Sequence, residues 1–310
     1  YSSQSKARRA KKKPLIVGYC TCHHLSSVTN ISGFDRYEKY DYSYTSGNSP
    51  IAIRHFNKIS NIIKKKFIKN KNCQLLEIAS NDGTFLKNFN NNKKINTVGI
   101  DPSKYMCKLA KKNKVNNVIN DFFDDKSSNK IKKKFGNFDL IYAANVFNHI
   151  DDPSNFLKGC NHILQDEGII ILGVPDLDSL INTCGFDTIY HEHRQYFSIN
   201  SMKKILNKNN FTLISFEKIN YMSGSLRVFA KKNVNNIKLT NKKVSEQKKY
   251  LNNFINFQKK IFLIKSEILN FIAKYKKKNK TIIGIAAATK GNTLLNFCGI
   301  NYNDLKNLFQ

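Results

Sequence analysis

The 310 residues are enough for two or more units of average size, and the 41% of apolar residues is ordinary for globular cores. The net charge is +30, but lysine is spread along the chain and rises together with asparagine, which favours a solvated surface over a nucleic-acid binder with its charge on one face. No apolar run approaches the roughly 20 residues of a membrane span, so we expect no membrane partner. The seven cysteines lie mostly singly, which is typical of a reduced, cytoplasmic protein. From the spread of charge we expect no nucleic-acid partner either.

The amino-terminal part predicts a basic tail and then a helix. The densest basic cluster is KARRAKKK at residues 6–13. Further on, Ser49 fits the N-cap of a helix and Pro50 its first position. Isoleucine and phenylalanine then recur at helical spacing to about residue 68, so we place the first helix there.

Buried strands alternate with helices through the middle of the chain. Strands are expected at residues 74–80, 96–101, 115–120, 138–147 and 168–175, and helices from about Thr84 and over residues 103–113 and 154–164. This alternation predicts an α/β fold with a Rossmann-like, doubly wound parallel sheet.

The carboxyl-terminal third predicts two further features. Residues 211–219 and 225–232 look like an antiparallel pair of strands that closes the sheet. A long lysine-rich helix at residues 242–278 then leads to TIIGIAAATKGNTLLNFCG, which restarts the pattern of strand, glycine turn and helix. We therefore expect a second, partial α/β unit with only its first strand and helix.

The ends of the first two strands carry polar residues. Open α/β sheets bind ligands at the carboxyl ends of their strands. The first strand ends in EIASNDG, and the second ends in Asp101, whose carboxylate could hold ribose hydroxyls. In the first turn Gly83 lets the backbone approach a ligand, and Asn81 tolerates a positive φ. On these residues alone, an ordinary strand-to-helix turn is the alternative to a nucleotide site.

A second candidate site is the stretch IYHEHRQYFS at residues 189–198, with two histidines, a glutamate and two tyrosines. By itself it fits an acid/base cluster, a metal site, or a polar loop before a helix capped by Ser198. A metal site is disfavoured because His191 and His193 form a short pair without a third ligand nearby in the sequence.

The order of these motifs resembles the class I S-adenosylmethionine (SAM) methyltransferases. LLEIASNDGTFL, VGIDPS, NDFFDD and DLIYAANVFNHIDDP follow one another as in that family. Its first motif, E-x-G-x-G-x-G, stands here as Glu77, Ala79, Asn81 and Gly83, with two glycines replaced. The match is closer to the C-methyltransferases of nucleotide-linked keto-deoxysugars, through SNDG, YAAN…HI, the segment 190–193, SGSLRV at 223–228 and NFCG at 296–299.

The resemblance covers about residue 14 to the end and divides the chain into four segments. It implies a basic tail and the remnant of a zinc module at residues 1–48, a SAM-binding domain at 49–232, a helical linker at 233–280, and the start of a truncated nucleotide-sugar domain at 281–310.

The resemblance also implies a SAM site. Its residues would be Glu77 at the methionine amino group, Ser80, Asn81 and Gly83 in the turn, Asp101 and Pro102 at the ribose, Asp121 and Phe122 at the adenine, and Asn145 and His149 beside the methyl donor. A helix or turn cap is the alternative role for Asp121, and a packing histidine is the alternative for His149.

Further residues are assigned to the reaction by the same resemblance. His193 would be the base that removes a proton next to a ketone, with Tyr190 and Glu192 as its partners, Tyr44 holding the sugar, and His191 pointing elsewhere. Ser225, Arg227, Lys290 and Asn292 would bind the nucleotide-linked sugar, with Lys290 at the pyrophosphate or, alternatively, in solvent. The implied activity is SAM-dependent C-methylation. O-methylation of another small metabolite and a SAM-fold binding module without catalysis stay open as alternatives.

The zinc module of the resembling family is only partly matched. PLIVGYCTCHHLSS resembles its second half, but Cys20 and Cys22 are separated by one residue instead of two. Structural zinc needs four tetrahedral ligands, and Cys20, Cys22, His23 and His24 lie too close together to supply all four easily. We therefore expect no bound zinc in this chain.

Overall fold

The structure is a computed structural model that describes residues 13–29, 44–68, 72–233, 244–285, 289–301, 303–305 and 308–309. The basic cluster expected at residues 6–13 lies, except for Lys13, outside the described residues, as do parts of the expected segments 1–48 and 233–280. Within the described part of the chain, no helix combines the length and the apolar character needed to cross a membrane.

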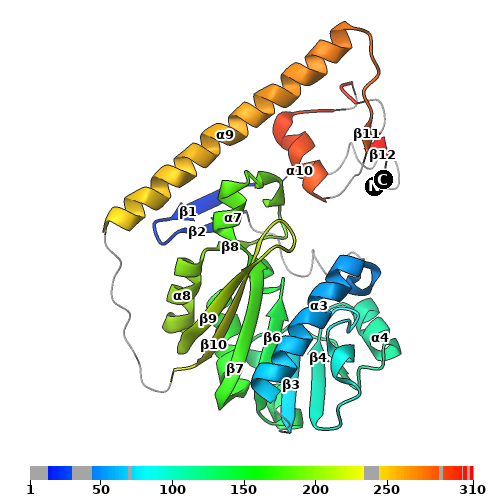
Figure 1. The fold of residues 1–310 in the computed structure, drawn as a ribbon, viewed down its shortest axis with the longest axis vertical. Coiled ribbons are helices and arrows are strands. Elements are labelled where there is room, and N and C mark those ends of the chain that lie inside the picture. Colours follow the sequence, from blue (N-terminus) through cyan, green and yellow to red (C-terminus); the bar gives the residue numbers. More distant parts are fainter. Residues whose placement is uncertain are drawn as a thin grey trace.

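A seven-stranded sheet forms the body of the molecule (Figure 1). Its strands, in order across the sheet, are β5 (Asn117–Ile119), β4 (Ile95–Ile100), β3 (Cys73–Ile78), β6 (Phe138–Ala144), β7 (Leu164–Pro175), β10 (Ser225–Lys232) and β9 (Phe211–Ile219). The first five are parallel, and β10 and β9 are added antiparallel. The predicted doubly wound sheet and its antiparallel pair are therefore confirmed. The chain leaves β3 in one direction across the sheet and returns to β6 in the other, so the switch point lies between these two strands.

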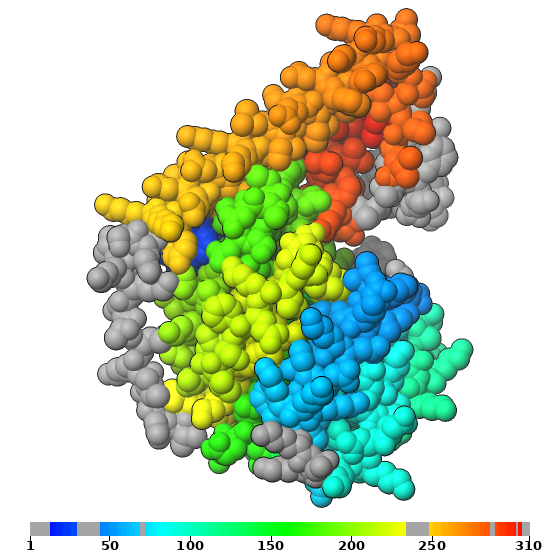
Figure 2. Space-filling model, viewed as in Figure 1, coloured from blue at the N-terminus to red at the C-terminus, as the bar shows by residue number. Residues whose placement is uncertain are grey.

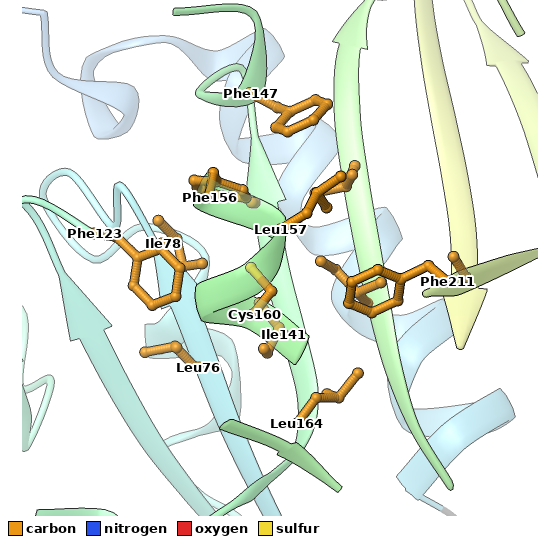
Figure 3. Close-up of a cluster of buried hydrophobic side chains, with 14 of the residues drawn as sticks. Leu76, Ile78, Phe123, Ile141, Phe147, Phe156, Leu157, Cys160, Leu164 and Phe211 are labelled. Atoms are coloured by element: carbon orange, nitrogen blue, oxygen red, sulfur yellow. The ribbon is translucent and has the colours of Figure 1, made fainter. Parts of the chain in front are cut away.

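Helices cover both faces of this sheet. One face carries α3 (Pro50–Ile63) and α4 (Lys104–Lys112), and the other carries α5 (Asp125–Phe135), α6 (Pro153–Ile163) and α8 (Ile199–Lys208). Successive side chains of a strand point to opposite faces, so Leu75 of β3 joins the first core and Leu76 the second. Figure 3 shows Phe156, Leu157 and Cys160 of α6 in the second core. Burial on both faces explains why these strands are apolar without alternation.

Capping residues begin two helices where the sequence predicts them. The hydroxyl of Ser49 accepts the N–H of Ala52, and Pro50 occupies the first turn of α3. This helix continues as a π-helical turn, η2 (Lys64–Ile68), to the expected end. Ser198 caps α8 by accepting the N–H of Ser201.

Two helical predictions between the strands need correction. The helix expected from about Thr84 is only a 3-10 turn, η3 (Leu86–Phe89). The asparagine run that follows favours turns, because asparagine side chains bond to nearby backbone, as when Asn92 accepts the N–H of Lys94. Conversely, α5 was not expected, although Asp124 and Ser127 form a capping box at its start.

A small antiparallel sheet attaches the amino-terminal segment to the body, and the sequence did not predict it. It consists of β1 (Val17–Cys20), β2 (His24–Ser27) and β8 (Gln195–Phe197). His23, in the turn between β1 and β2, lies with Nε2 2.7 Å from Oδ1 of Asp178 in α7 (Leu177–Asn182). The hairpin is thereby joined to residues far along the chain.

The long helix α9 (Val244–Lys277) lies along this end of the body, over the segment that contains α7 (Figure 2). Its Phe254 stacks on Tyr19 with ring centroids 4.5 Å apart, and its Tyr250 stacks on His23 at 4.1 Å. Aromatic stacking therefore attaches α9 to the amino-terminal hairpin.

The carboxyl-terminal unit contains α10 (Thr289–Cys298), β11 (Gly284–Ile285) and β12 (Leu308–Phe309). We expected one strand here, but β12 pairs in parallel with β11, so the unit has a second strand. The ring of Phe297 in α10 lies 5.1 Å from that of Phe186 in the 3-10 turn η5 (Phe186–Thr188). This contact seats the unit on the body.

The packing of α6 against the start of α5 depends on Gly159, and this generates a prediction. A Cβ at Gly159 would lie 2.9 Å from the carbonyl oxygen of Asp124, which is fixed backbone. Alanine gains about 1 kcal/mol of helix propensity, but we expect the clash to dominate, so that Gly159→Ala lowers the free energy of unfolding by about 1–3 kcal/mol. Urea denaturation measures this, with Lys158→Ala on the exposed face of α6 as the control. An unchanged stability would show that the two helices separate at no cost.

Candidate active site

A cavity of about 470 Å³ opens at the carboxyl ends of the strands beside the switch point. Most of the predicted site residues line this cavity, although they come from distant parts of the chain. Those that line it are Tyr44, Glu77, Ser80, Asn81, Asp101, Pro102, Asp121, Phe122, Asn145, His149, Tyr190, Glu192, His193 and Lys290.

Four predicted residues lie outside the cavity wall. Gly83 lies in the turn below it. Ser225 donates its hydroxyl to the carbonyl of Tyr221, and Arg227 is buried in contact with Glu217 and His55. The side-chain oxygen of Asn292 accepts a hydrogen bond from Asn296 within α10. The structure therefore does not place Ser225, Arg227 and Asn292 where a cavity ligand would touch their side chains.

The turn after β3 has a left-handed backbone at each position where the resembling motif has glycine. The φ angles are 58° at Ala79, 49° at Asn81 and 77° at Gly83. A left-handed conformation costs a residue with a Cβ about 1–2 kcal/mol, and asparagine tolerates it better than alanine. The two replacements therefore keep the path of the glycine turn, with strain at Ala79.

Asn81 also ties this turn to the segment that carries Tyr44. Its side-chain amide donates to the carbonyl of Tyr44, and its side-chain oxygen accepts the N–H of Ser46. The neighbouring Asp82 accepts the N–H of Gly47 at 2.8 Å. These bonds hold residues 44–47, including the first two residues of the 3-10 turn η1 (Ser46–Asn48), at the edge of the cavity.

Two buried carboxyl groups stand at the strand ends. Oε2 of Glu77 has no hydrogen-bond partner among the described residues, and burial, with Asp82 and Asp101 nearby, raises the pKa of Glu77 well above its usual range. Asp101 accepts the N–H groups of Asn81 and Ser103, while burial raises its pKa to about 6. The hydroxyl of Ser80 is likewise buried without a partner among the described residues. The wall therefore offers acceptors to a ligand with amino and hydroxyl groups.

Asp121 does not cap the helix that follows it. The N-cap of α5 is Asp124, whereas Oδ1 of Asp121 accepts the adjacent N–H of Phe122 and its Oδ2 lies 3.7 Å from Nζ of Lys130. Asp121 is therefore not the cap of this helix, its bond to the N–H of Phe122 leaves a turn cap open, and Asp121 and Phe122 both line the cavity.

His193 lies buried behind Tyr190 with both ring nitrogens engaged. Nδ1 lies 2.9 Å from the carbonyl oxygen of Thr188, and Nε2 lies 2.9 Å from the hydroxyl of Tyr190. A carbonyl only accepts, so Nδ1 carries the proton and Nε2 accepts from Tyr190. Burial, with a smaller contribution from the positive Lys290, lowers the pKa of His193 to about 4. The ring is thus a neutral base with a fixed tautomer.

The other members of this cluster have distinct positions. The ring of His149, in the 3-10 turn η4 (Phe147–His149), meets that of His193 edge-on at 5.0 Å. His191 reaches the carbonyl of Pro14 and does not line the cavity, whereas Glu192 lines it. The polar-loop interpretation of this stretch does not account for such convergence on one cavity.

Within the described part of the chain, no group of three or more histidine, cysteine and acidic side chains could hold a metal ion. Cys20 is exposed, its sulfur accepts the N–H of Cys22, and His23 faces Asp178. The absence of zinc stays a prediction.

Sequence reasoning missed two residues of this site. Thr188 orients His193 through its backbone carbonyl, for which its side chain gives no signal. Tyr221 lines the cavity and lies two residues before the first residue of the SGSLRV motif, so its position near that motif was a usable signal.

A family model described as "Methyltransferase domain" matches residues 51–216, more than half of the chain. The chain belongs to this methyltransferase family. A second model, the C-methyltransferase C-terminal domain, matches residues 221–309 and so begins within the segment that we assigned to the SAM-binding domain. The predicted resemblance to class I methyltransferases, and to C-methyltransferases among them, is confirmed.

Relatives with known names or structures are distant in sequence. The C-methyltransferase NovU of Streptomyces niveus is 24% identical over 272 residues, which cover 86% of this chain and 64% of that protein; the chain thus spans under two thirds of this relative. The PH0226 protein from Pyrococcus horikoshii OT3 has a TM-score of 0.47 and 19% identity, covering 64% of this chain and 100% of that chain. Magnesium protoporphyrin IX methyltransferase (ChlM) from Synechocystis PCC 6803, with bound SAH, has a TM-score of 0.46 and 16% identity, covering 64% of this chain and 94% of that chain.

The low pKa of His193 predicts how the stability of this methyltransferase depends on pH. Below its usual pKa of 6.5 the unfolded chain binds a proton at this residue, and the folded chain binds one only near pH 4. The free energy of unfolding should therefore fall on acidification between these values, by up to about 1.4 kcal/mol per pH unit from this group.

His193→Gln should reduce that slope, and His162→Gln, at an exposed position of α6, should not. Urea denaturation from pH 7 to pH 4.5 measures both. An equal slope in wild type and His193→Gln would mean that the folded protein already binds a proton at His193 in this range.

Proposed function

We propose that this chain is a SAM-dependent C-methyltransferase that adds a methyl group to a carbon next to the ketone of a nucleotide-linked keto-deoxysugar. One observation carries the proposal: a neutral histidine of fixed tautomer, His193, stands in the same cavity as the buried strand-end carboxyls Glu77 and Asp101. A carbon next to a ketone becomes nucleophilic only when it loses a proton, so methylation there needs a base. Transfer to a hydroxyl group makes a weaker demand on such a base.

The residues at the strand ends fit SAM. The unpartnered carboxylate oxygen of Glu77 would accept from its ammonium group, and Asp101 has lone pairs left for the ribose hydroxyls. Asp121 and Phe122 would border the adenine. When bound, SAM supplies an electrophilic methyl group for the carbon that the base has activated.

In the proposed reaction His193 acts on the sugar. The Tyr190 hydroxyl first turns away from Nε2 of His193, whose lone pair it otherwise occupies. The C–H bond next to the ketone then breaks, its proton goes to Nε2 of His193, and the electron pair moves to the enolate oxygen. The imidazolium that forms keeps its Nδ1–H on the Thr188 carbonyl. Tyr190, 2.9 Å from Nε2, and Glu192 in the same wall are its partners. The low pKa of His193 keeps its Nε2 unprotonated at neutral pH.

Lys290 supports a substrate with a pyrophosphate. It comes from α10 of the carboxyl-terminal unit, lines the cavity, and donates to the hydroxyl of Ser223 at 3.1 Å. A lysine ammonium suits the negative charge of a nucleotide-linked sugar. The match of residues 221–309 to a C-methyltransferase C-terminal domain, and the similarity to the C-methyltransferase NovU, support transfer of the methyl group to carbon.

Calorimetry with SAH tests the cofactor site. Asp101→Ala should weaken binding by about 1.5–3 kcal/mol, because hydrogen bonds to a charged group are lost, and Asp166→Ala at an exposed position should not weaken it. In the wild type, affinity should fall below pH 6, where Asp101 takes up a proton and loses acceptor capacity. Absent binding by a chain with folded circular dichroism would contradict the proposed cofactor.

Hydrogen exchange and mass spectrometry test the reaction. With a panel of nucleotide keto-sugars in deuterated water and SAH in place of SAM, the proton next to the ketone should exchange. His193→Asn should slow exchange by about 10²–10⁴-fold, while SAH affinity stays within about threefold because the histidine is not a cofactor ligand. His191→Asn, whose side chain points away from the cavity, is the matched control.

With SAM present, the product should carry the new methyl group on the carbon that exchanged. A methylated product without prior exchange would instead favour O-methylation. Exchange at the wild-type rate in His193→Asn would remove His193 from the role of base.

A further inference from the structure

The residue that follows the proposed base, Arg194, joins three segments of the chain. Its side chain is buried, with 7% of the residue exposed. Nε donates to Oδ1 of Asp151 at 2.6 Å, and Nη1 donates to Oγ of Ser27 at 2.9 Å and to the carbonyl of Thr29. Ser27 ends β2 and Asp151 lies just after η4, so one guanidinium connects the amino-terminal hairpin to the loop after β6. Charge-assisted hydrogen bonds to a planar guanidinium fix the directions of its partners.

The backbone of Arg194 makes the same connection. Its N–H donates to the carbonyl of Asn148 at 2.8 Å, and its carbonyl accepts the N–H of Ser27 at 2.8 Å. A further bond, from Gln195 to the carbonyl of Ile150, is long at 3.4 Å and therefore weaker. The segment of the proposed base is thus bonded to the hairpin on one side and to the loop after β6 on the other.

The loop is anchored on both sides of His149. The backbone of Arg194 holds Asn148, which precedes His149, and its guanidinium holds Asp151, two residues further on. One strong anchor would let the loop rotate about it, whereas two fix the direction of the His149 ring. That ring meets the ring of His193 edge-on, with centroids 5.0 Å apart, and both residues line the cavity.

The two histidines differ in what else holds them. Nδ1 of His193 is fixed by the carbonyl of Thr188, without help from Arg194. The N–H of His149 donates to the carbonyl of Val146, which belongs to the same loop, so this bond does not tie the loop to the base segment. Loss of the guanidinium should therefore displace His149 more than His193.

We propose that Arg194 is a positioning residue that sets the distance between the base and the methyl donor, by holding the loop of His149 against the segment of His193. The inference rests on the proposed function and on the expected place of His149 beside the methyl donor. Methyl transfer needs the activated carbon and the donor in a fixed geometry, and a displacement of about 1 Å can cost about 10²-fold in rate. Removal of the proton needs only the sugar and His193. Arg194 therefore acts on methyl transfer more than on proton removal.

A reaction in deuterated water with SAM and the panel of nucleotide keto-sugars measures both steps, because mass spectrometry compares deuterium in recovered substrate with methylated product. Arg194→Met keeps a buried aliphatic chain and removes the side-chain hydrogen bonds, so methyl transfer should slow about 10–100-fold while exchange stays within about threefold. Ser27→Ala, which removes one of these bonds outside the cavity, should shift the ratio in the same direction by about threefold. Arg54→Met, at an exposed position of α3, should keep the wild-type ratio.

Two outcomes would overturn the proposal. If both steps slow equally in Arg194→Met, the residue supports the cavity as a whole and not the spacing within it. If neither step slows, the loop keeps its place without the guanidinium. Folded circular dichroism and SAH affinity within about threefold of the wild type qualify a variant for this comparison. Ser27→Ala carries the test if Arg194→Met does not fold, and an unchanged ratio in it then counts against the proposal.

A measurement without substrate separates this inference from the proposed function. In protein with isotope-labelled histidine, NMR should show a nuclear Overhauser effect between the ring protons of His149 and His193, since these rings are in contact. His149→Gln and His193→Gln assign the signal. It should weaken in Arg194→Met and persist in Arg54→Met, and an unchanged signal in Arg194→Met would overturn the positioning role. If the wild type neither exchanges nor methylates a keto-sugar, the proposed function fails, and this signal still decides whether Arg194 holds the two rings together.

Discussion

The site depends on the backbone path of one turn, at residues 79–83, and on the asparagine in its middle. The backbone N–H of Asn81 fixes the carboxylate of Asp101, while its side chain holds the backbone at Tyr44 and Ser46. A glycine would allow the same positive φ but make neither side-chain bond. The replacement that departs from the family motif therefore joins the strand ends at Asp101 to the segment that carries Tyr44.

The ionisable groups inside the cavity differ in kind from the lysines that give the chain its positive net charge. The chain has a net charge of +30, yet the strand ends gather buried acids, and burial raises the pKa of Glu77 and Asp101. On the catalytic side burial keeps His193 and His55 neutral instead. Desolvation disfavours the charged form of each group, so a positively charged ligand would stabilise the carboxylates of Glu77 and Asp101, while the histidines stay neutral without one. Lys290 at the cavity wall makes a smaller contribution to the lowered pKa of His193.

The sequence predicted what local rules control and missed what pairing across the chain controls. Apolar runs buried on both faces gave the central strands, and Ser49 and Ser198 gave two helix starts. The small sheet of β1, β2 and β8 joins segments about 170 residues apart, so no local pattern announces it. The motif residues that line the cavity were assigned through the resemblance to the methyltransferase motifs. The direction of Arg227 was not, because it follows from the register that sets this residue opposite Glu217.

The 3-10 turn η5 has two neighbours that are otherwise separate. Its first residue, Phe186, receives the Phe297 ring of α10, and its last, Thr188, holds the proton on Nδ1 of His193 through its carbonyl. Lys290 belongs to the same helix as Phe297. The contact that seats the carboxyl-terminal unit and the carbonyl that fixes the tautomer of His193 therefore lie within one turn of three residues. Under the proposed function, the position of the proposed base would thus depend on how the carboxyl-terminal unit is seated.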